Sequence, residues 1–420
     1  MTTMKRRTVA ATATPAGATR ARIIGLDGAR GLSCLGVAVM HVTAHYTPDT
    51  AASYKTNVVG MSLIFFYVLS GFLLFLPYVR GLTERRDGAT MPGTANFAVH
   101  RIARILPGYV VIFLLVNFVL QAAFVSNPVL QPPRTEQGTG MITDPWQLLA
   151  NLTLTQSYVP QYFQTGINTS WSLTLEYAFY AILPLLCMVL FAMRRRTGLG
   201  PFTIAFIGAT SLVVLGLVGR FFIPLVNART GILDPAALDW GPNWGAVYSR
   251  TLLTNADNFA AGMLAAVAFV AMEQRSPSEA LSRNVRRLSI IALFPLLFLT
   301  LLLIGLRSPY GTSALGMACG VAILIIVAPL ARGEDSAIAR WLDVRPVRFI
   351  GTISLSVYLW HYPVMLVLGR WGLMADDTLT GMLQNTVVVL AVTTVLSVAT
   401  YYLVEEPVMK AAKRYRHRWA

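Results

Sequence analysis

Long apolar runs constrain this chain most, because each one is long enough to cross the hydrocarbon core of a lipid bilayer. In a helix, about 20 apolar residues span the roughly 30 Å of hydrocarbon, and the helix satisfies its own backbone hydrogen bonds there. We therefore expect an all-α integral membrane protein, a bundle of about ten transmembrane helices. The runs lie at 26–46, 57–79, 106–126, 171–193, 202–223, 253–272, 288–306, 311–331, 349–369 and 383–404.

Composition and charge distribution favour a membrane protein over a nucleic-acid-binding protein. Hydrophobic residues make up 55% of the 420 residues, and the net charge is +15. Most Lys and Arg residues lie in alternate connections between the apolar runs, which is the pattern of cytoplasmic loops. The sequence thus predicts cytoplasmic N- and C-termini and no binding of nucleic acid. We expect a disordered basic cytoplasmic tail at 1–23, a transmembrane domain at 24–408 and a basic cytoplasmic tail at 409–420.

The first run carries two ionisable side chains, Arg30 and His41, which are eleven residues apart. In a helix this spacing is close to three full turns, so both lie on one face, about 16 Å apart along the axis. Ionisable groups inside an apolar span usually face a protein interior or a wet cavity. The two are therefore a candidate catalytic cation and base. The alternative is an Arg at a helix start and a His that is hydrogen-bonded in the core.

Glu176 is the candidate partner of His41. Each lies a few residues inside the expected outer end of its run, so we expect the two side chains at similar depth. A carboxylate beside an imidazole orients the ring and raises its basicity, which suits a general base and its orienting group. A structural buried ion pair is the alternative.

Arg101 and Arg104 precede the third run and are three residues apart, on one helical face. Two guanidinium groups at the cytoplasmic end of a span suit a phosphate-bearing ligand, because guanidinium matches phosphate oxygens bidentately. They are candidate acyl-CoA-binding residues. Ordinary anchoring by positive charge on the inner side is the alternative.

Other polar or aromatic side chains within the runs are candidate acceptor-binding or pocket-lining residues. Long connections at 127–170 and 224–252 also suit recognition of a polar or glycosidic molecule, unless they only cap the bundle. The three cysteines lie in apolar runs without metal-ligand spacing, so we expect no metal site. The candidates are Ser70, Trp171, Asp257, Tyr358 and His361.

The motifs of this chain, taken together and in order, resemble the acyltransferase-3 family of bacterial integral-membrane O-acyltransferases. The resemblance extends from Ile24 to about Val408. It is carried by LDGARG followed by His41, and by FFYVLSGFLL, HRIARILP, SWSLTLEYAFY, SLSVYLWHYP and EEP. Because few residues follow the last run, the chain resembles the stand-alone members, without an appended hydrolase-like domain.

This resemblance implies a multi-pass protein of the bacterial inner membrane that transfers an acyl group to a hydroxyl. The donor is acetyl-CoA or another acyl-CoA, used as a co-substrate with no bound cofactor. The acceptor is a sugar, a glycan or a macrolide, and membrane lipid surrounds the bundle; a homo-oligomer is compatible with the sequence. His41 and Arg30 match the essential pair of the family, Arg101 and Arg104 its donor-binding motif, and Glu176 its acid.

Two mechanisms and two functions remain open at this point. His41 acts either as the general base on the acceptor hydroxyl or as a nucleophile that carries the acyl group transiently. The alternative function is a transporter or flippase for a lipid-linked glycan, although the chain shows no repeat of the transporter kind.

Overall fold

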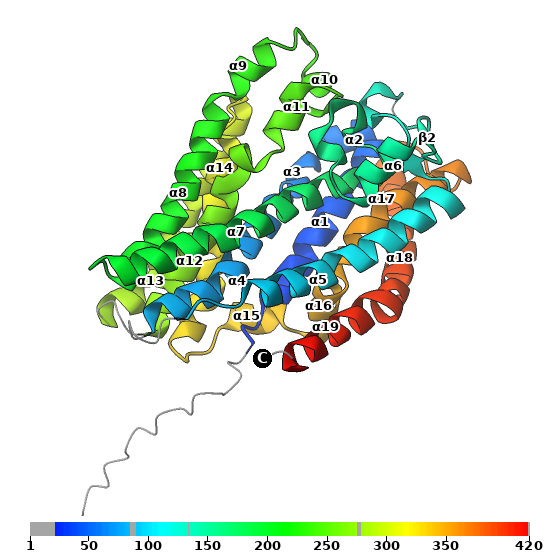
Figure 1. Cartoon of the computed structure of the whole chain (residues 1–420). Helices are drawn as coiled ribbons and strands as arrows, with labels where there is room; N and C mark the ends of the chain where they lie inside the picture. The colour runs from blue at the N-terminus through cyan, green and yellow to red at the C-terminus, as the bar shows by residue number, and fades with distance from the viewer. Residues whose placement is uncertain (1–21, 85–89, 133, 275–278, 419–420) are drawn as a thin grey trace, which may run out of the picture.

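The computed structural model describes residues 22–84, 90–132, 134–274 and 279–418, and its long helices lie side by side in one bundle (Figure 1). The predicted N-terminal tail lies almost wholly outside the described residues. A helix occupies each predicted apolar run. The long helices are α1 (Leu26–Tyr46), α4 (Leu63–Thr83), α5 (Thr94–Leu114), α7 (Trp171–Arg196), α8 (Pro201–Phe221), α12 (Leu252–Glu273), α13 (Glu279–Gly305), α14 (Gly311–Ala331), α17 (Ser354–Arg370) and α18 (Leu379–Thr400).

The expected all-α membrane bundle is confirmed, with a smaller number of clear spans than the ten predicted. Within the described ranges, eight helices are long and apolar enough to cross a membrane. The number is nine if α16 (Arg345–Thr352) and α17, which are bent by 72° at their junction, form one span. Helix α1 is outside this set, because Arg30, His41 and other polar residues lower its apolarity. Which termini face the cytoplasm stays a prediction.

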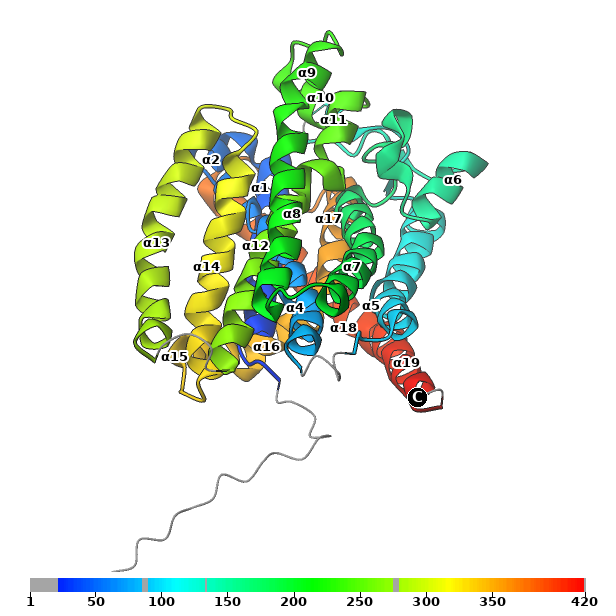
Figure 2. The ribbon, with the colours of Figure 1, turned by 60° about the vertical axis from the view of Figure 1, so that its left-hand side comes forward.

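Short elements close the two ends of the bundle. In Figure 1, α2, α6 and α9–α11 lie at the upper end, called here the loop end, and α15, α16 and α19 lie at the lower, Arg- and Lys-rich end, called here the basic end. Figure 2 shows α13 and α14 along one edge of the bundle, and α5 and α19 along the opposite edge. The short helices are α2 (Pro48–Ser53), α3 (Asn57–Gly60), α6 (Pro145–Leu152), α9 (Ile223–Ala228), α10 (Pro235–Trp240), α11 (Trp244–Ser249), α15 (Ala337–Leu342) and α19 (Glu406–Arg418).

The connection between α5 and α7 is folded rather than extended. Strands β1 (Ala123–Phe124) and β2 (Thr139–Gly140) pair antiparallel. Single 3-10 turns occupy Pro128–Leu130, Gln156–Tyr158, Pro160–Tyr162 and Asn168–Ser170. Two π-helical turns, Leu115–Val119 and Tyr401–Glu405, follow α5 and α18, and the second leads into α19 without a break. The segment predicted as a basic tail at 409–420 is therefore helical as far as Arg418.

Helix α1 lies inside the bundle and packs closely on α16. A Cβ atom on Gly351 would lie only 1.8 Å from the backbone oxygen of Asp27, so only glycine allows this approach. The close contact brings the carbonyl of Gly351, at the end of α16, next to the side chain of Arg30. The end of α16, at the break before α17, thus supplies a backbone acceptor to a cation in α1.

Candidate functional site

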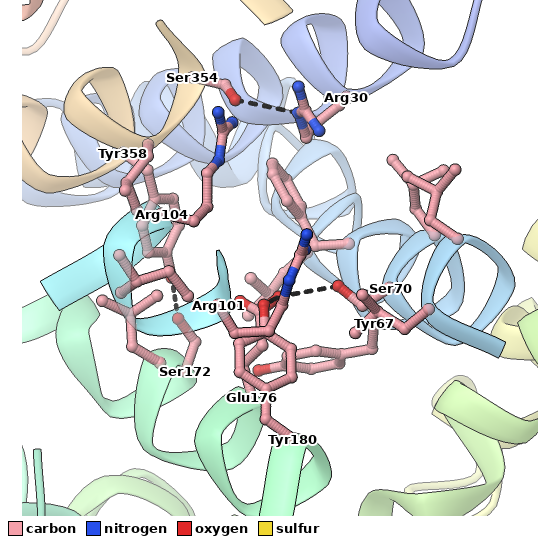
Figure 3. A pocket seen from close by; sticks show the side chains of 18 residues that line it. Arg30, Tyr67, Ser70, Arg101, Arg104, Ser172, Glu176, Tyr180, Ser354 and Tyr358 are labelled. Atoms are coloured by element: carbon pink, nitrogen blue, oxygen red, sulfur yellow. Dashed lines mark hydrogen bonds between the residues drawn. The ribbon is translucent and has the colours of Figure 1, made fainter. Parts of the chain in front are cut away.

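A pocket opens between α1, α4, α5, α7 and α17, and encloses about 790 Å³, including space open to solvent. Figure 3 shows its charged side chains pointing toward a common space from three different helices. Its polar and aromatic lining residues are Arg30, Phe66, Tyr67, Ser70, Arg101, Arg104, Ser172, Glu176, Tyr180, Ser354 and Tyr358.

Arg30 is held at the pocket by acceptors from three helices, α1, α16 and α17. Its Nη2 donates to Asp27 Oδ1 at 2.8 Å and to the carbonyl of Gly351 at 2.9 Å. Its Nε lies 3.2 Å from the hydroxyl oxygen of Ser354 (Figure 3). A carbonyl at a helix C-terminus favours a cation, so the end of α16 stabilises this guanidinium. Nη1 makes no hydrogen bond to the described residues, which leaves one donor group for a ligand.

Arg101 and Arg104 enter the same pocket from α5. Arg104 contacts the sulfur of Met409 on α19 at 3.6 Å, and Arg101 has neither a hydrogen bond nor an ion pair within the described part of the chain. Both side chains are part-buried. The pocket therefore holds three guanidinium groups, and at least two of them keep donors available. This arrangement is well suited to phosphate oxygens.

Glu176 is also in the pocket, but it does not pair with His41 as expected. Its Oε1 accepts hydrogen bonds from Ser70 on α4, at 2.8 Å, and from Tyr180, one turn along α7. Among the described residues that line the pocket, Glu176 is the one carboxylate. Its charge thus lies among the arginines.

His41 lies deeper along α1 and contacts a second histidine instead. Its Nδ1 is 2.9 Å from Nε2 of His361 on α17, and the rings are nearly parallel, with centroids 5.1 Å apart. The predicted pairing of His41 with Glu176 is therefore wrong. The number of residues from the outer end of a span predicts only how deep a side chain lies in the membrane. Its hydrogen-bond partner depends on the direction in which the side chain leaves its helix.

Aromatic side chains separate the pocket from the histidine pair. Tyr358 and Phe66 both line the pocket, with ring centroids 6.1 Å apart, and the ring of Tyr358 is 5.9 Å from that of His361. The Tyr358 hydroxyl is 2.8 Å from the hydroxyl of Ser172. Neither histidine lines the pocket as the described residues form it.

Two of the other candidates lie outside this pocket. Trp171 packs edge-on against Trp240, with centroids 5.6 Å apart, and Arg250 covers the Trp240 ring at 3.8 Å. Asp257 forms a buried ion pair with Arg220 on α8, with an Nε to Oδ2 distance of 3.1 Å. Both were expected as acceptor-binding or pocket residues because they are polar or amphipathic groups near a span end. In the structure, Trp171 packs against loop-end residues and Asp257 is paired with a neighbouring helix.

Some lining residues were not singled out from the sequence. Ser172 and Tyr180 are four residues before and after Glu176, so all three lie on one face of α7. That spacing was legible in SWSLTLEYAFY and could have identified them. Ser354 gave no comparable signal, because its place depends on the break between α16 and α17.

Comparison with known proteins identifies the family. Residues 23–402 match the family described as the acyltransferase domain. The chain belongs to this acyltransferase family. The match covers all the helices that form the pocket and the histidine pair, so both features are parts of the acyltransferase domain.

Curated relatives of this acyltransferase domain are named as O-acetyltransferases. O-acetyltransferase OatA of Staphylococcus aureus (strain NCTC 8325 / PS 47) is 23% identical over 401 residues, covering 92% of this chain and 57% of the relative. The putative peptidoglycan O-acetyltransferase YrhL of Bacillus subtilis (strain 168) is 23% identical over 402 residues, covering 92% and 55%. Peptidoglycan O-acetyltransferase OatA of Listeria monocytogenes (serovar 1/2a, strain ATCC BAA-679 / EGD-e) is 22% identical over 351 residues, covering 82% and 50%. The chain thus spans about half the length of these relatives. No solved structure matches it significantly.

Proposed function

We propose that this acyltransferase is a membrane enzyme that transfers an acetyl or other short acyl group from acyl-CoA to a hydroxyl of a sugar or glycan. The observation that carries the proposal is the convergence of Arg30, Arg101 and Arg104 on one pocket, where Glu176 is the single carboxylate among the described lining residues. Such a pocket suits an anionic ligand, and coenzyme A is an acyl donor rich in phosphate.

The donor enters from the basic end of the bundle. The phosphates of coenzyme A bind to Arg101 and Arg104, and Nη1 of Arg30 offers a third donor group. The positive-inside pattern favours a cytoplasmic location for this end, on the side of the membrane where acyl-CoA is made. The thin pantetheine arm then extends along α1 toward His41, about 16 Å further along the helix axis than Arg30. Because aromatic rings close this path, a displacement of Tyr358 or Phe66 accompanies productive binding.

His41 supplies the base for transfer. The acceptor hydroxyl loses its proton to the imidazole while its oxygen attacks the thioester carbonyl, the carbon–sulfur bond breaks, and the coenzyme A thiolate takes up a proton as it leaves. In the other variant the imidazole attacks first, and the acceptor hydroxyl then takes the acyl group from nitrogen. The geometry serves both variants equally.

The acceptor class rests on the relatives. Two of them are named for peptidoglycan, so a glycan hydroxyl is the first acceptor to test. A macrolide is the second, because its hydroxyl groups offer the same nucleophile on an apolar scaffold.

Binding and transfer are tested with the purified chain in detergent. Arg101→Gln and Arg104→Gln should each weaken coenzyme A binding about tenfold, which corresponds to roughly 1.4 kcal/mol for a lost charge-assisted contact. Arg229→Gln, an exposed arginine at the loop end, is the matched control and should bind as wild type. Equal affinity in all four proteins would refute the donor site.

Acyl transfer is read as free thiol released from acetyl-CoA. Release that requires a peptidoglycan fragment, or a macrolide, supports the enzyme and assigns the acceptor. Absence of release with any acceptor, together with counterflow of a lipid-linked glycan in vesicles, would instead favour a transporter.

A further inference from the structure

The histidine pair between α1 and α17 carries more information than proximity, because its hydrogen bonds have a direction. Nδ1 of His361 lies 3.2 Å from the backbone oxygen of Val357, and Nε2 of His361 lies 2.9 Å from Nδ1 of His41. A carbonyl oxygen only accepts hydrogen bonds, so Nδ1 of His361 carries a hydrogen. In a neutral ring the other nitrogen, Nε2, is then the acceptor, and Nδ1 of His41 is the donor.

We propose that His361 is a positioning residue that fixes the tautomer of His41, with hydrogen on Nδ1 and a free lone pair on Nε2. This inference rests on the proposed function, because the Nε2 lone pair is the atom that accepts the proton of the acceptor or attacks the acyl group. Both variants of the mechanism require it. A histidine in the opposite tautomer would present an N–H to the substrate and could do neither.

Burial keeps His361 neutral and out of the reaction itself. Its side chain is 0% exposed, whereas His41 retains part of its surface. Among the described residues, no carboxylate forms a hydrogen bond or ion pair with either ring. A cationic His361 would therefore be buried without a counter-charge, which is costly. The neutral ring is an acceptor only at Nε2, and no part of its side chain is exposed to the pocket.

The remaining contacts hold the ring of His41 in place and leave Nε2 available. Tyr362 packs against His41 at an interplanar angle of 64°, with centroids 5.2 Å apart. Nε2 of His41 has no hydrogen-bond partner among the described residues. The atom is also not fully buried, so a substrate can reach it. The structure thus fixes one nitrogen of the ring and leaves the other open. A carboxylate commonly fills this orienting role, and Glu176 is the residue that the sequence predicts for it; in the structure His361 takes that position.

The direct test is the tautomer of His41, measured without any substrate. The chain has five histidines, so nitrogen NMR of histidine-labelled protein is tractable, and His41→Gln identifies the His41 signals by their loss. We expect Nδ1 of His41 to be protonated and Nε2 unprotonated in the wild type. The opposite assignment would overturn the inference, whatever the activity. If acyl transfer fails but the Nδ1–H tautomer is found, the inference stands and the proposed function fails.

Kinetics give an independent readout. His361→Leu removes the nitrogen that accepts the hydrogen bond from Nδ1 of His41. We expect kcat to fall about 100-fold, within the usual contribution of a well-placed base. The KM for acyl-CoA should stay unchanged, because His361 does not line the donor pocket. His361→Gln carries an amide oxygen that can accept from Nδ1 of His41, and it should recover at least about tenfold of the loss. A His361→Leu protein with wild-type kcat would refute the role. Thermal unfolding of both variants separates this effect from loss of the fold.

Discussion

Ser70 on α4 and Glu176 on α7 are joined across the pocket by a hydrogen bond of 2.8 Å, in which the serine hydroxyl donates to Oε1. The carboxylate is thereby held among three arginines rather than beside His41. Its negative charge opposes the phosphates of a donor in the same pocket. We therefore expect Glu176 to influence the affinity for the acyl donor more directly than the acyl-transfer step.

Glu176→Gln removes this charge while keeping the size of the side chain. We expect coenzyme A to bind more tightly by about 1 kcal/mol or less, up to roughly a fivefold lower Kd, as for a partly solvated charge pair. Isothermal titration with coenzyme A measures it. Ser70→Ala, which keeps the carboxylate, is the control and should change the Kd less. Weaker binding by the Gln variant would contradict this view of the pocket.

Asp257 stabilises the helix packing rather than the pocket. It forms a buried ion pair with Arg220, and both side chains are 5% exposed. Asp257→Asn leaves a buried guanidinium without its counter-charge, which typically costs about 3–5 kcal/mol. We expect a clearly lower unfolding temperature with unchanged affinity for coenzyme A. The double variant Arg220→Met with Asp257→Leu should recover part of the stability, and no recovery would argue for a role beyond charge pairing.

Phe66 forms part of the aromatic wall between the pocket and the histidine pair. Phe66→Trp enlarges this wall, so we expect acetyl transfer to fall about tenfold or more, since misplacing the reacting groups is costly. Coenzyme A affinity should not change, because the phosphates bind at the arginines. Phe66→Leu, which makes the side chain smaller, is the matched control and should retain transfer. Equal rates for the Trp variant and the wild type would show that the thioester takes another path.

At the loop end, Asp377 joins the segment before α18 to α2 and to the connection between α5 and α7. We therefore expect it to make the stability of the protein depend on pH. Its carboxylate accepts from the backbone N–H groups of Asp49 and Thr50, at 2.9 and 3.0 Å, and pairs with Arg134. Desolvation acts to raise the pKa of Asp377, but these hydrogen bonds and the arginine outweigh it and lower the pKa to about 2. An unfolded aspartate has a pKa of about 3.9.

Because the folded-state pKa of Asp377 is the lower one, its contribution to stability is present above about pH 4 and is lost as the pH falls toward about 2. We expect Asp377→Asn to lower the unfolding temperature at pH 7, and the difference from wild type to shrink over that acidic range. The neighbouring Asp376→Asn is the control, with an exposed residue and no such contacts. A difference that persists unchanged at pH 2 would contradict the assignment.

The membrane bundle and most helix positions followed from the pattern of apolar residues. The predicted run 311–331 coincides with α14, and 26–46 coincides with α1. Helix α5 is the main exception, because it begins at Thr94 rather than at 106. The first turns of α5 are polar, so the pattern of apolar residues does not include them in the predicted span. These turns nevertheless carry Arg101 and Arg104 of the pocket.

The partners of the site residues could not be obtained in this way. His361 was found as a polar group within a span, but its contact with His41 depends on how α17 turns about its own axis after the break at α16. The same break places Gly351 and Ser354 against Arg30. Neither bend nor rotation is encoded in the apolar pattern of one run.

The sequence by itself determined that this chain is a helical membrane protein, which cations and histidines its spans contain, and how far apart Arg30 and His41 lie along α1. Those properties depend on hydropathy and on the constant rise of a helix, which are local. Only the tertiary structure decided that Glu176 faces the arginines and that His361 faces His41. The direction of a side chain is set by packing between helices distant in sequence; for the contacts of α1 with α16 and α17, the close approach at Gly351 and the broken helix contribute to it.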